Sequence, residues 1–233
     1  MIREIQKDIR KSADATRAKN LKRFFKTDPG EYGEGDVFIG LTVPQSRAFA
    51  KKYFETPLKD LEVLLKSEIH EERLIALIIL SNRFAKSDER EKFQIYKLYL
   101  KNTKYINNWD LVDTSAEYIV GGYLYDKDRK VLQQLAKSKS LWERRIAMLS
   151  TFHFIKKGEY QDTLRIARIL LKDEHDLIHK ASGWMLREMG KRVSEKELRG
   201  FLEKYASKMP RTMLRYAIEK FSPKDRRYYL DLK

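Results

Sequence analysis

Trp109 and Asp113 are the residues whose types and spacing most suggest a chemical site. They are four positions apart, so on a helix they lie on one face. A carboxylate can stabilise a positive charge, and the face of an indole ring attracts one. Asp110 can be explained as an acid in the first turn of a helix. Asp113 lies beside Val112, well past the first turn, and so needs another explanation.

A repeated pattern brings in two further residues. Ala76, Val112, Ala147 and Gly183 follow one another at steps of about 36 residues. A small residue in the middle of a helix allows neighbouring helices to approach, and helical pairs of this period are typical of HEAT- or armadillo-like repeats. The pattern makes Trp184 equivalent to Asp113.

The same pattern places Arg145 one turn before the position equivalent to Asp113. We therefore expect Trp109, Asp113, Arg145 and Trp184 to converge on one concave face. Taken singly, each has a plainer interpretation, because tryptophans usually fill a core and Asp113 could pair with Arg145. Together they are better interpreted as a site.

The elements that would position this site are helices joined by short turns. We predict an all-α, HEAT/armadillo-like helical-repeat solenoid with a concave basic face, in one domain covering residues 1–233. Residues 1–43 would form an N-terminal helical cap with a Gly-rich loop, and residues 44–233 the tandem helical pairs. The segment 36–44 has β-branched residues, but no other segment could pair with it as a strand, so we predict an ordered apolar loop. The helices are predicted at 2–26, from 44, from 57, and at 71–84, 88–100, 108–125, 128–136, 141–155, 159–171, 177–189, 194–206 and 210–221, followed by a short tail.

The charge balance predicts a polyanionic partner. The formal net charge is +15 over 233 residues, which is most often the mark of a nucleic-acid-binding protein. Cationic side chains near the starts of the second helices would line the concave face and bind phosphates: Arg73, Arg144, Arg145, Lys180, Arg187, Arg211 and Arg215. The alternative is that these are surface charges of a protein-binding solenoid, and the pattern alone does not separate the two.

Several classes of protein are excluded or disfavoured. The chain has no cysteine, which excludes disulfides, thiol nucleophiles and cysteine-based metal sites. His175 and His179 have helical spacing, but no HExxH pattern surrounds them, so a pair of surface histidines is favoured over a metal site. No apolar run approaches a membrane span, and residues 1–5 show no signal peptide. We expect a cytoplasmic protein, nucleoid-associated when bound to DNA.

Three motifs carry a resemblance to a known family. Trp109–Asp113 (WDLVD), Leu141–Leu149 (LWERRIAML) and Lys180–Glu188 (KASGWMLRE) resemble the AlkD-type DNA alkylation repair family, the HEAT-like DNA glycosylases. The segment 38–44 (FIGLTVP) resembles the N-terminal loop of that family. The resemblance covers nearly the whole chain, and the three central motifs are specific in combination.

The resemblance implies excision of N3- and N7-alkylated purines from double-stranded DNA by a monofunctional, monomeric enzyme without a metal or other cofactor. By motif, Asp113 matches the catalytic carboxylate, Trp109 and Trp184 match the aromatic walls, and Arg145 matches a phosphate-contacting arginine. The family also uses an aromatic residue of its N-terminal helical region. Tyr32 is the nearest candidate, but its spacing departs from the family pattern, and it is left out of the site.

The chemistry of such a reaction fits these residue types. An alkylated purine is already a cationic leaving group, so one carboxylate suffices where ordinary glycosidases use two. Asp113 would stabilise the cationic sugar and orient the attacking water. One alternative is a non-catalytic protein that binds damaged or branched DNA, and another is a scaffold for an acidic protein, which predicts an apolar groove. The presence of all four site residues favours the enzyme.

Overall fold

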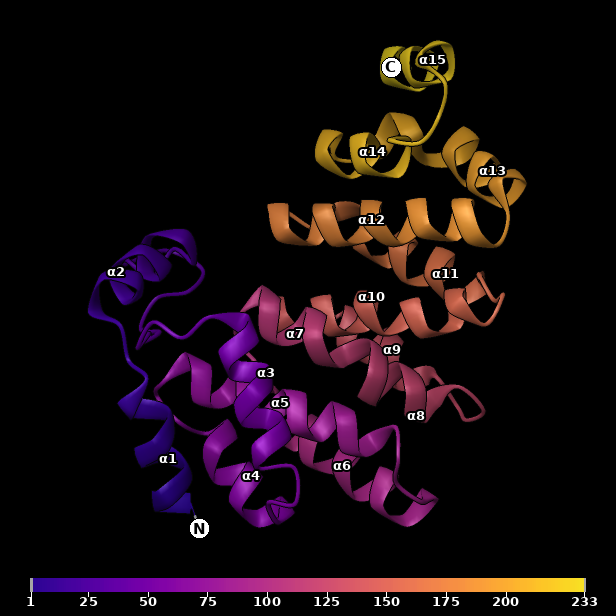
Figure 1. The fold of residues 1–233 in the computed structure, drawn as a ribbon. Helices are drawn as coiled ribbons and strands as arrows, with labels where there is room; N and C mark the ends of the chain where they lie inside the picture. Colours follow the sequence, from indigo (N-terminus) through magenta and orange to yellow (C-terminus); the bar gives the residue numbers. More distant parts are fainter. Residues whose placement is uncertain (1, 233) are drawn as a thin grey trace. The chain divides into compact units, whose positions relative to one another are not determined.

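The computed structural model describes residues 2–232 and is all-helical over that range, as predicted (Figure 1). The backbone falls into two compact units, the first ending at Ile119 and the second beginning at Val120. Unit 1 contains α1 (Ile2–Lys11), α2 (Ala15–Phe24), α3 (Val43–Lys52), α4 (Leu58–Leu65), α5 (His70–Phe84), α6 (Glu89–Lys101), η1 (Thr103–Tyr105) and α7 (Trp109–Ala116). A π-helical turn, η2 (Glu117–Gly121), follows α7. Unit 2 contains α8 (Gly122–Leu124), α9 (Lys130–Ala136), α10 (Leu141–Lys156), α11 (Gln161–Ile169), η3 (Leu170–Lys172), α12 (Asp176–Arg192), α13 (Glu195–Tyr205), η4 (Ala206–Lys208), α14 (Arg211–Ala217) and α15 (Pro223–Asp231).

Unit 1 is built around α5. The run from Leu74 to Leu80 is buried on every side of this helix. A helix that is apolar all round must be surrounded by other elements, and α3, α4, α6 and α7 all contact α5. The core of unit 1 therefore lies along α5, and α7 is held directly against it.

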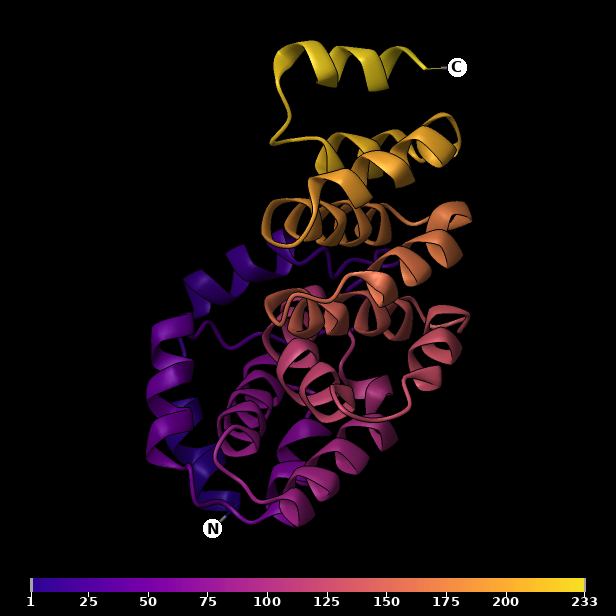
Figure 2. The same ribbon diagram turned by 90° about the vertical axis from the view of Figure 1, so that its right-hand side faces the viewer.

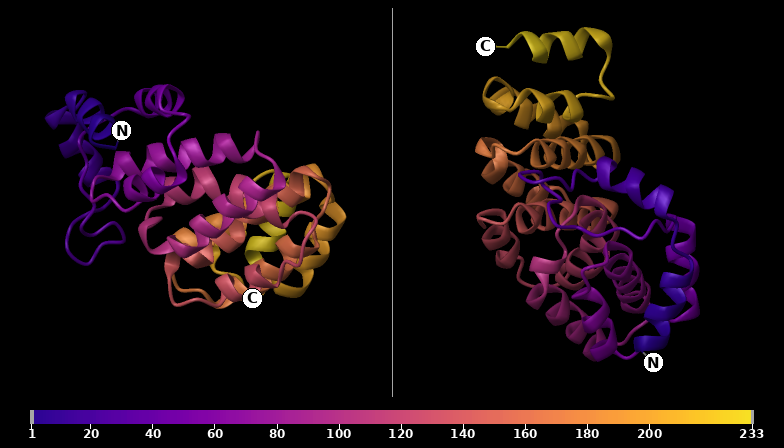
Figure 3. Two further views of the ribbon diagram at one scale, coloured as in Figure 1. Left: turned by 90° about the horizontal axis from the view of Figure 1, so that it is seen from below. Right: turned by 90° about the vertical axis from the view of Figure 1, so that its left-hand side faces the viewer.

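Unit 2 consists of stacked helical pairs. The pairs α9–α10, α11–α12 and α13–α14 follow one another, and α12 contacts α10 on one side and α14 on the other (Figures 2 and 3). Gly183 lies where α12 meets α14, and a Cβ atom there would be 2.4 Å from both the carbonyl oxygen of Met213 and the Cβ of Tyr216. The glycine thus permits the close approach that the repeated small residues predict.

Local sequence signals explain where several elements begin. The segment 36–42 is irregular, with one isolated bridge from Val37 to Ile69, so the predicted apolar loop is confirmed. Thr42 then starts α3 through a reciprocal capping box with Gln45. Ser194 accepts a hydrogen bond from the backbone N–H of Glu197 and caps α13 at the predicted position.

Two predicted boundaries were wrong. The stretch 2–26 is two helices, because Asp14 caps a second start. The stretch predicted at 108–125 is helical from 109 to 124 and contains the π-helical turn η2. The predicted C-terminal tail contains the helix α15, which Ser222 caps and Pro223 begins. The polar composition of this helix obscured its start signal in the sequence. Within residues 2–232 the structure has no helix long and apolar enough to cross a membrane.

The contact of Gly183 with α14 yields a matched test. We expect Gly183→Ala to lower the free energy of unfolding by about 1–3 kcal/mol or more, because backbone atoms of α14 must move. Gly200→Ala should leave it unchanged or raise it by about 0.5–1 kcal/mol, since a Cβ at Gly200 meets no atom within 4 Å. Urea denaturation of both variants measures the difference. Equal effects would contradict the packing described for Gly183.

Candidate active site

Helix α7 presents Trp109 and Asp113 on the same face, one turn apart. Asn108 caps the helix, and its Oδ1 accepts the backbone N–H of Trp109 at 2.8 Å. The opposite face, with Leu111, Val112 and Ser115, is fully buried. Trp109 and Asp113 are each half-buried. The arrangement offers one indole and one carboxylate that are held firmly but retain some access to solvent.

The side chain of Trp109 lies against α2, which sequence reasoning did not connect with it. The ring of Phe25 stacks on Trp109 with centroids 5.2 Å apart and planes 21° apart. Phe24 meets the indole edge-on at 5.9 Å and is itself 63% exposed. Phe24 therefore extends the aromatic surface around Trp109 towards solvent. The adjacent aromatic pair at the end of a basic helix is the signal that could have marked these residues.

Helix α2 is also strongly basic. None of its residues is fully buried, and exposed cations lie on both sides of the aromatic pair in the sequence, namely Lys19, Lys22, Arg23 and Lys26. Tyr32, the predicted nearest aromatic of this region, lies half-buried in the following loop. Phe24 and Phe25 both contact the ring of Trp109.

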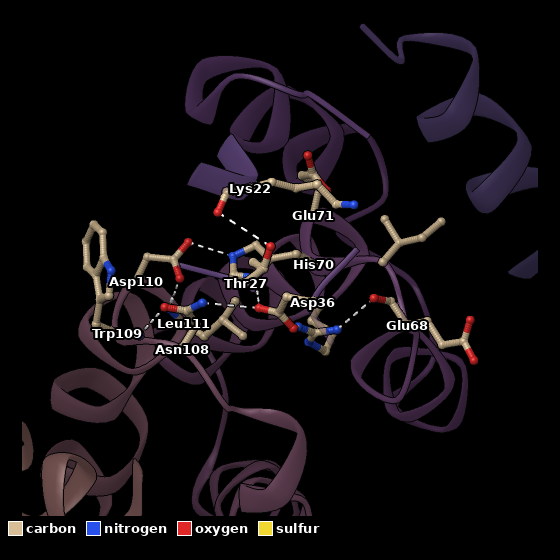
Figure 4. Close-up of polar contacts among 12 residues, drawn as sticks. Lys22, Thr27, Asp36, Glu68, His70, Glu71, Asn108, Trp109, Asp110 and Leu111 are labelled. Atoms are coloured by element: carbon tan, nitrogen blue, oxygen red, sulfur yellow. Dashed lines mark hydrogen bonds and ion pairs between the residues drawn. The ribbon is translucent and has the colours of Figure 1, made fainter. Parts of the chain in front are cut away.

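A largely buried group of charged side chains includes Asp110, the neighbour of Trp109 in the chain (Figure 4). His70 begins α5 and is 1% exposed. Its Nδ1 lies 2.9 Å from a carboxylate oxygen of Asp36, and its Nε2 lies 2.8 Å from one of Asp110. Asp36 also pairs with the guanidinium of Arg73 and accepts a hydrogen bond from Asn108 at 3.1 Å. The residues that flank Trp109 in sequence are thus both tied into this group.

The electrostatics of the group favour a protonated His70. Burial alone would lower the pKa of His70, but the negative charge of Asp110 and hydrogen bonds to Asp110 and Asp36 raise it to about 9. Burial would raise the pKa of Asp36, but the hydrogen bond with His70 and the charge of Arg73 bring it below its usual value. At neutral pH the group therefore contains an imidazolium between two carboxylates.

The next two residues of α5 hold neighbouring segments in place. The carboxylate of Glu71 accepts backbone N–H bonds from Ile39, Gly40 and Leu41, at 2.8 to 3.2 Å. Glu72 accepts hydrogen bonds from Arg10 at 3.0 Å and from Gln6 at 2.9 Å, both on α1. These carboxylates fix the loop that carries Phe38 and the position of α1.

The other two predicted site residues lie in unit 2. Trp184, on α12, is half-buried, with its ring centroid 6.0 Å from that of Phe152 on α10. Arg145, on α10, is 5% exposed and donates to the carbonyl of Leu177 at 2.6 Å. Their convergence with Trp109 and Asp113, and the phosphate contact of Arg145, stay predictions.

Arg73 and Arg144, which the sequence pattern makes equivalent, make the same contacts within the protein. Each guanidinium donates to the carbonyls six and five residues before it in the chain, in the turn before its helix. Each also pairs with an aspartate, Asp36 for Arg73 and Asp173 for Arg144. Arg73 is 4% exposed and its guanidinium is engaged within the protein, and DNA binding by Arg73 stays a prediction. The guanidinium of Arg144 is also largely engaged within the protein.

The remaining predicted DNA-binding residues divide into paired and exposed cations. Arg187 pairs with Glu188 and Glu219, and Lys180 pairs with Asp176 at 2.6 Å. Arg211 and Arg215, on α14, are exposed, and neither has an ion pair among the residues that the structure describes. These two arginines are the members of the predicted set with charge most available for a phosphate.

The two closely spaced histidines have structural roles. The Nδ1 of His175 accepts the backbone N–H of Leu177 and caps α12. The ring of His179 bonds to the carbonyl of Asp173. Across residues 2–232, no group of three or more histidine, aspartate or glutamate side chains could hold a metal ion. The histidine pair is therefore explained by the way α12 begins.

Comparisons with known proteins agree with the sequence motifs. The family model described as DNA alkylation repair enzyme matches residues 5–221. A solved structure titled as a predicted DNA alkylation repair enzyme from Enterococcus faecalis superimposes with a TM-score of 0.69, covering 91% of this chain and 97% of that chain. Its sequence identity is 16%, so it shows a shared fold. A comparison with curated proteins gave no match.

The aromatic contacts of Trp109 give a second matched test. We expect Phe25→Ala to lower the free energy of unfolding by about 3–5 kcal/mol, because this ring is buried between Trp109 and Phe38. Phe24→Ala should change it by less than about 1 kcal/mol, since most of that ring is already in water. Chemical denaturation followed by far-UV circular dichroism checks both values. A large loss for Phe24→Ala would mean that this ring belongs to the core.

Proposed function

This chain belongs to the DNA alkylation repair enzyme family, and from that premise we propose that it is a DNA glycosylase. The reaction is hydrolysis of the N-glycosidic bond of N3- or N7-alkylated purines in double-stranded DNA. The observation that carries the proposal is the pairing of Trp109 and Asp113 on one accessible face of α7. Membership in the family supports a role in the repair of alkylated DNA, and this pairing supports the reaction.

The proposed reaction needs little from the protein besides electrostatics. Alkylation at N3 or N7 gives the purine a positive charge, so it leaves as a neutral base without a general acid. Positive charge then develops on the deoxyribose as the glycosidic bond breaks. A carboxylate at Asp113 stabilises that charge and orients the attacking water. Only one carboxylate is needed, in contrast to glycosidases that must protonate the leaving group.

Trp109 supplies the second element of the proposed site. The electron-rich face of an indole attracts a cationic base or sugar. Its ring is backed by Phe25 and bordered by the exposed Phe24, which gives a continuous aromatic surface. We assign Phe24 the role of the N-terminal aromatic residue that sequence reasoning sought at Tyr32. The exposed cations of α2 would then neutralise the phosphates beside the lesion.

Unit 2 completes the proposal with Trp184 as a further aromatic wall and Arg145 as the phosphate-contacting arginine. Arg211 and Arg215 of α14 would bind the DNA backbone. The proposed protein acts as a monomer, without a metal or another cofactor.

Asp113→Asn tests the reaction directly. We expect it to slow base release by at least about 10²–10³-fold, because the neutral amide cannot stabilise the cationic sugar. Its binding to duplex DNA should persist. The measurement is release of N7-methylguanine from a duplex that contains one such base, under single-turnover conditions. Asp128→Asn is the matched control, because Asp128 is an exposed residue of unit 2.

Wild-type rates from Asp113→Asn would overturn the catalytic assignment. Tight binding of the damaged duplex without release by the wild-type protein would instead favour a non-catalytic protein that binds damaged or branched DNA.

Arg211→Ala and Arg215→Ala test the proposed backbone contacts. Each neutralised phosphate contributes about 0.9 to the slope of log K against log salt concentration. We therefore expect each substitution to reduce the slope by about 0.9. Arg168→Ala is the control, because Arg168 is exposed on α11, outside the layer formed by α10, α12 and α14. Fluorescence anisotropy with a labelled duplex gives the slopes, and unchanged slopes for both α14 variants would remove these arginines from the interface.

A further inference from the structure

The two neighbours of Trp109 in the chain are both connected to the same buried carboxylate, that of Asp36. Asn108, which precedes it, donates from Nδ2 to Asp36 at 3.1 Å. Asp110, which follows it, reaches Asp36 through the ring of His70, at 2.8 and 2.9 Å (Figure 4). The backbone of Trp109 is therefore fixed from both sides, relative to a carboxylate that belongs to a different segment of the chain.

The side chain of Trp109 is linked to the same histidine by a cluster of rings. His70 stacks on Phe38 with centroids 4.4 Å apart, Phe38 on Phe25 at 5.0 Å, and Phe25 on Trp109 at 5.2 Å. The ring of Phe25 also contacts His70 directly, with centroids 5.2 Å apart and planes tilted by 38°, so His70, Phe38 and Phe25 form one cluster. Phe25 stacks on the indole with planes 21° apart, and it therefore connects the imidazole of α5 with Trp109 of α7.

His70 cannot take part in the reaction directly. It is 1% exposed, and both of its ring nitrogens face carboxylates. Neither nitrogen is available to a substrate or to an attacking water. The charge of His70 nevertheless decides whether both carboxylates can be held at once, because a neutral imidazole has only one N–H to donate.

We propose that His70, held between Asp36 and Asp110, is a positioning residue that fixes Trp109, and through α7 also Asp113, for the reaction. This inference rests on the proposed function, because that function supplies the substrate on which Trp109 and Asp113 act. The placement of Trp109 itself can be observed without DNA. The polar connection fixes the backbone of α7 at Trp109, and Phe25, which packs on both His70 and Trp109, fixes the indole, so the loss of His70 loosens both.

The proposal predicts a pH dependence with a defined sign. The charged and titratable groups that face His70 are Asp36 from the loop, Asp110 from α7 and, through Asp36, Arg73 of α5. They raise the pKa of His70 to about 9, above its ordinary value near 6.5. The interaction is therefore fully present below about pH 6.5 and is lost as pH rises through about 9. Base release should fall over the same alkaline range.

The experiment uses protein labelled with 5-fluorotryptophan, in which Trp109→Phe assigns the resonance of Trp109. In the wild-type protein we expect this ¹⁹F resonance to shift with a midpoint near pH 9. In His70→Asn the shift should disappear, and base release should fall by about tenfold to a hundredfold, as for a small misplacement of a reacting group. The residual base release of His70→Asn should no longer decline above pH 9. His153→Asn, the same substitution on α10 in unit 2, should retain both the ¹⁹F shift and the alkaline decline.

Asp110→Asn provides a second variant that keeps the histidine. Removing one of the two carboxylates lowers the pKa of His70, so the midpoint of the ¹⁹F shift should move to lower pH. Thermal unfolding monitored by circular dichroism shows that each variant is folded at the temperature of the assay.

The proposal would be overturned if the Trp109 resonance shows no transition in the wild-type protein, or if it titrates identically in His70→Asn. The wild-type protein could also release no base at any pH while its Trp109 transition disappears in His70→Asn. That result would uphold the positioning of Trp109 and reject the glycosylase.

Discussion

The buried charges at the start of α5 are the interactions on which the rest of unit 1 depends. Four consecutive residues, His70 to Arg73, are each buried, and their side chains bind α1, the 36–41 loop, the turn before α5 and the first turn of α7. Burial of so many charges is unfavourable unless each is paired, and removing one partner of a buried pair typically costs about 3–5 kcal/mol. The cluster therefore specifies one arrangement of these segments, and that arrangement brings α2 against Trp109.

The same set of arginine contacts occurs in both units. Arg73 and Arg144 each bind two carbonyls of the preceding turn and one aspartate from elsewhere in the chain. A guanidinium suits this role, because its donors are numerous and fixed in direction. The strong positive charge of the chain thus overstates the charge available to DNA. Part of it holds turns together, and the exposed part includes α2 and α14.

The sequence predicted what depends on local patterns. Helical spacing gave the helices, capping residues gave several of their starts, and the small residue at Gly183 indicated a close helix contact. Trp109 and Asp113 could be chosen because four-residue spacing on a helix is itself local. His70 and Asp36 could not, because their pairing joins residues 34 positions apart and leaves no periodic signal. The contact of Phe25 with Trp109 is similarly remote in sequence. Arg73 was expected to be exposed, but it forms a buried ion pair with Asp36, which composition does not reveal.

The protonation state of His70 at neutral pH tests most directly whether this buried cluster positions the site. Selective ¹⁵N labelling of histidine would distinguish its ring nitrogens from those of the other three histidines, with His70→Asn providing the assignment. The account predicts that both nitrogens of His70 carry protons at pH 7.5 and that the ring titrates near pH 9. A neutral His70 at pH 7.5, titrating at or below 6.5, would contradict it, because one of the two carboxylates would then have no proton to accept from the ring.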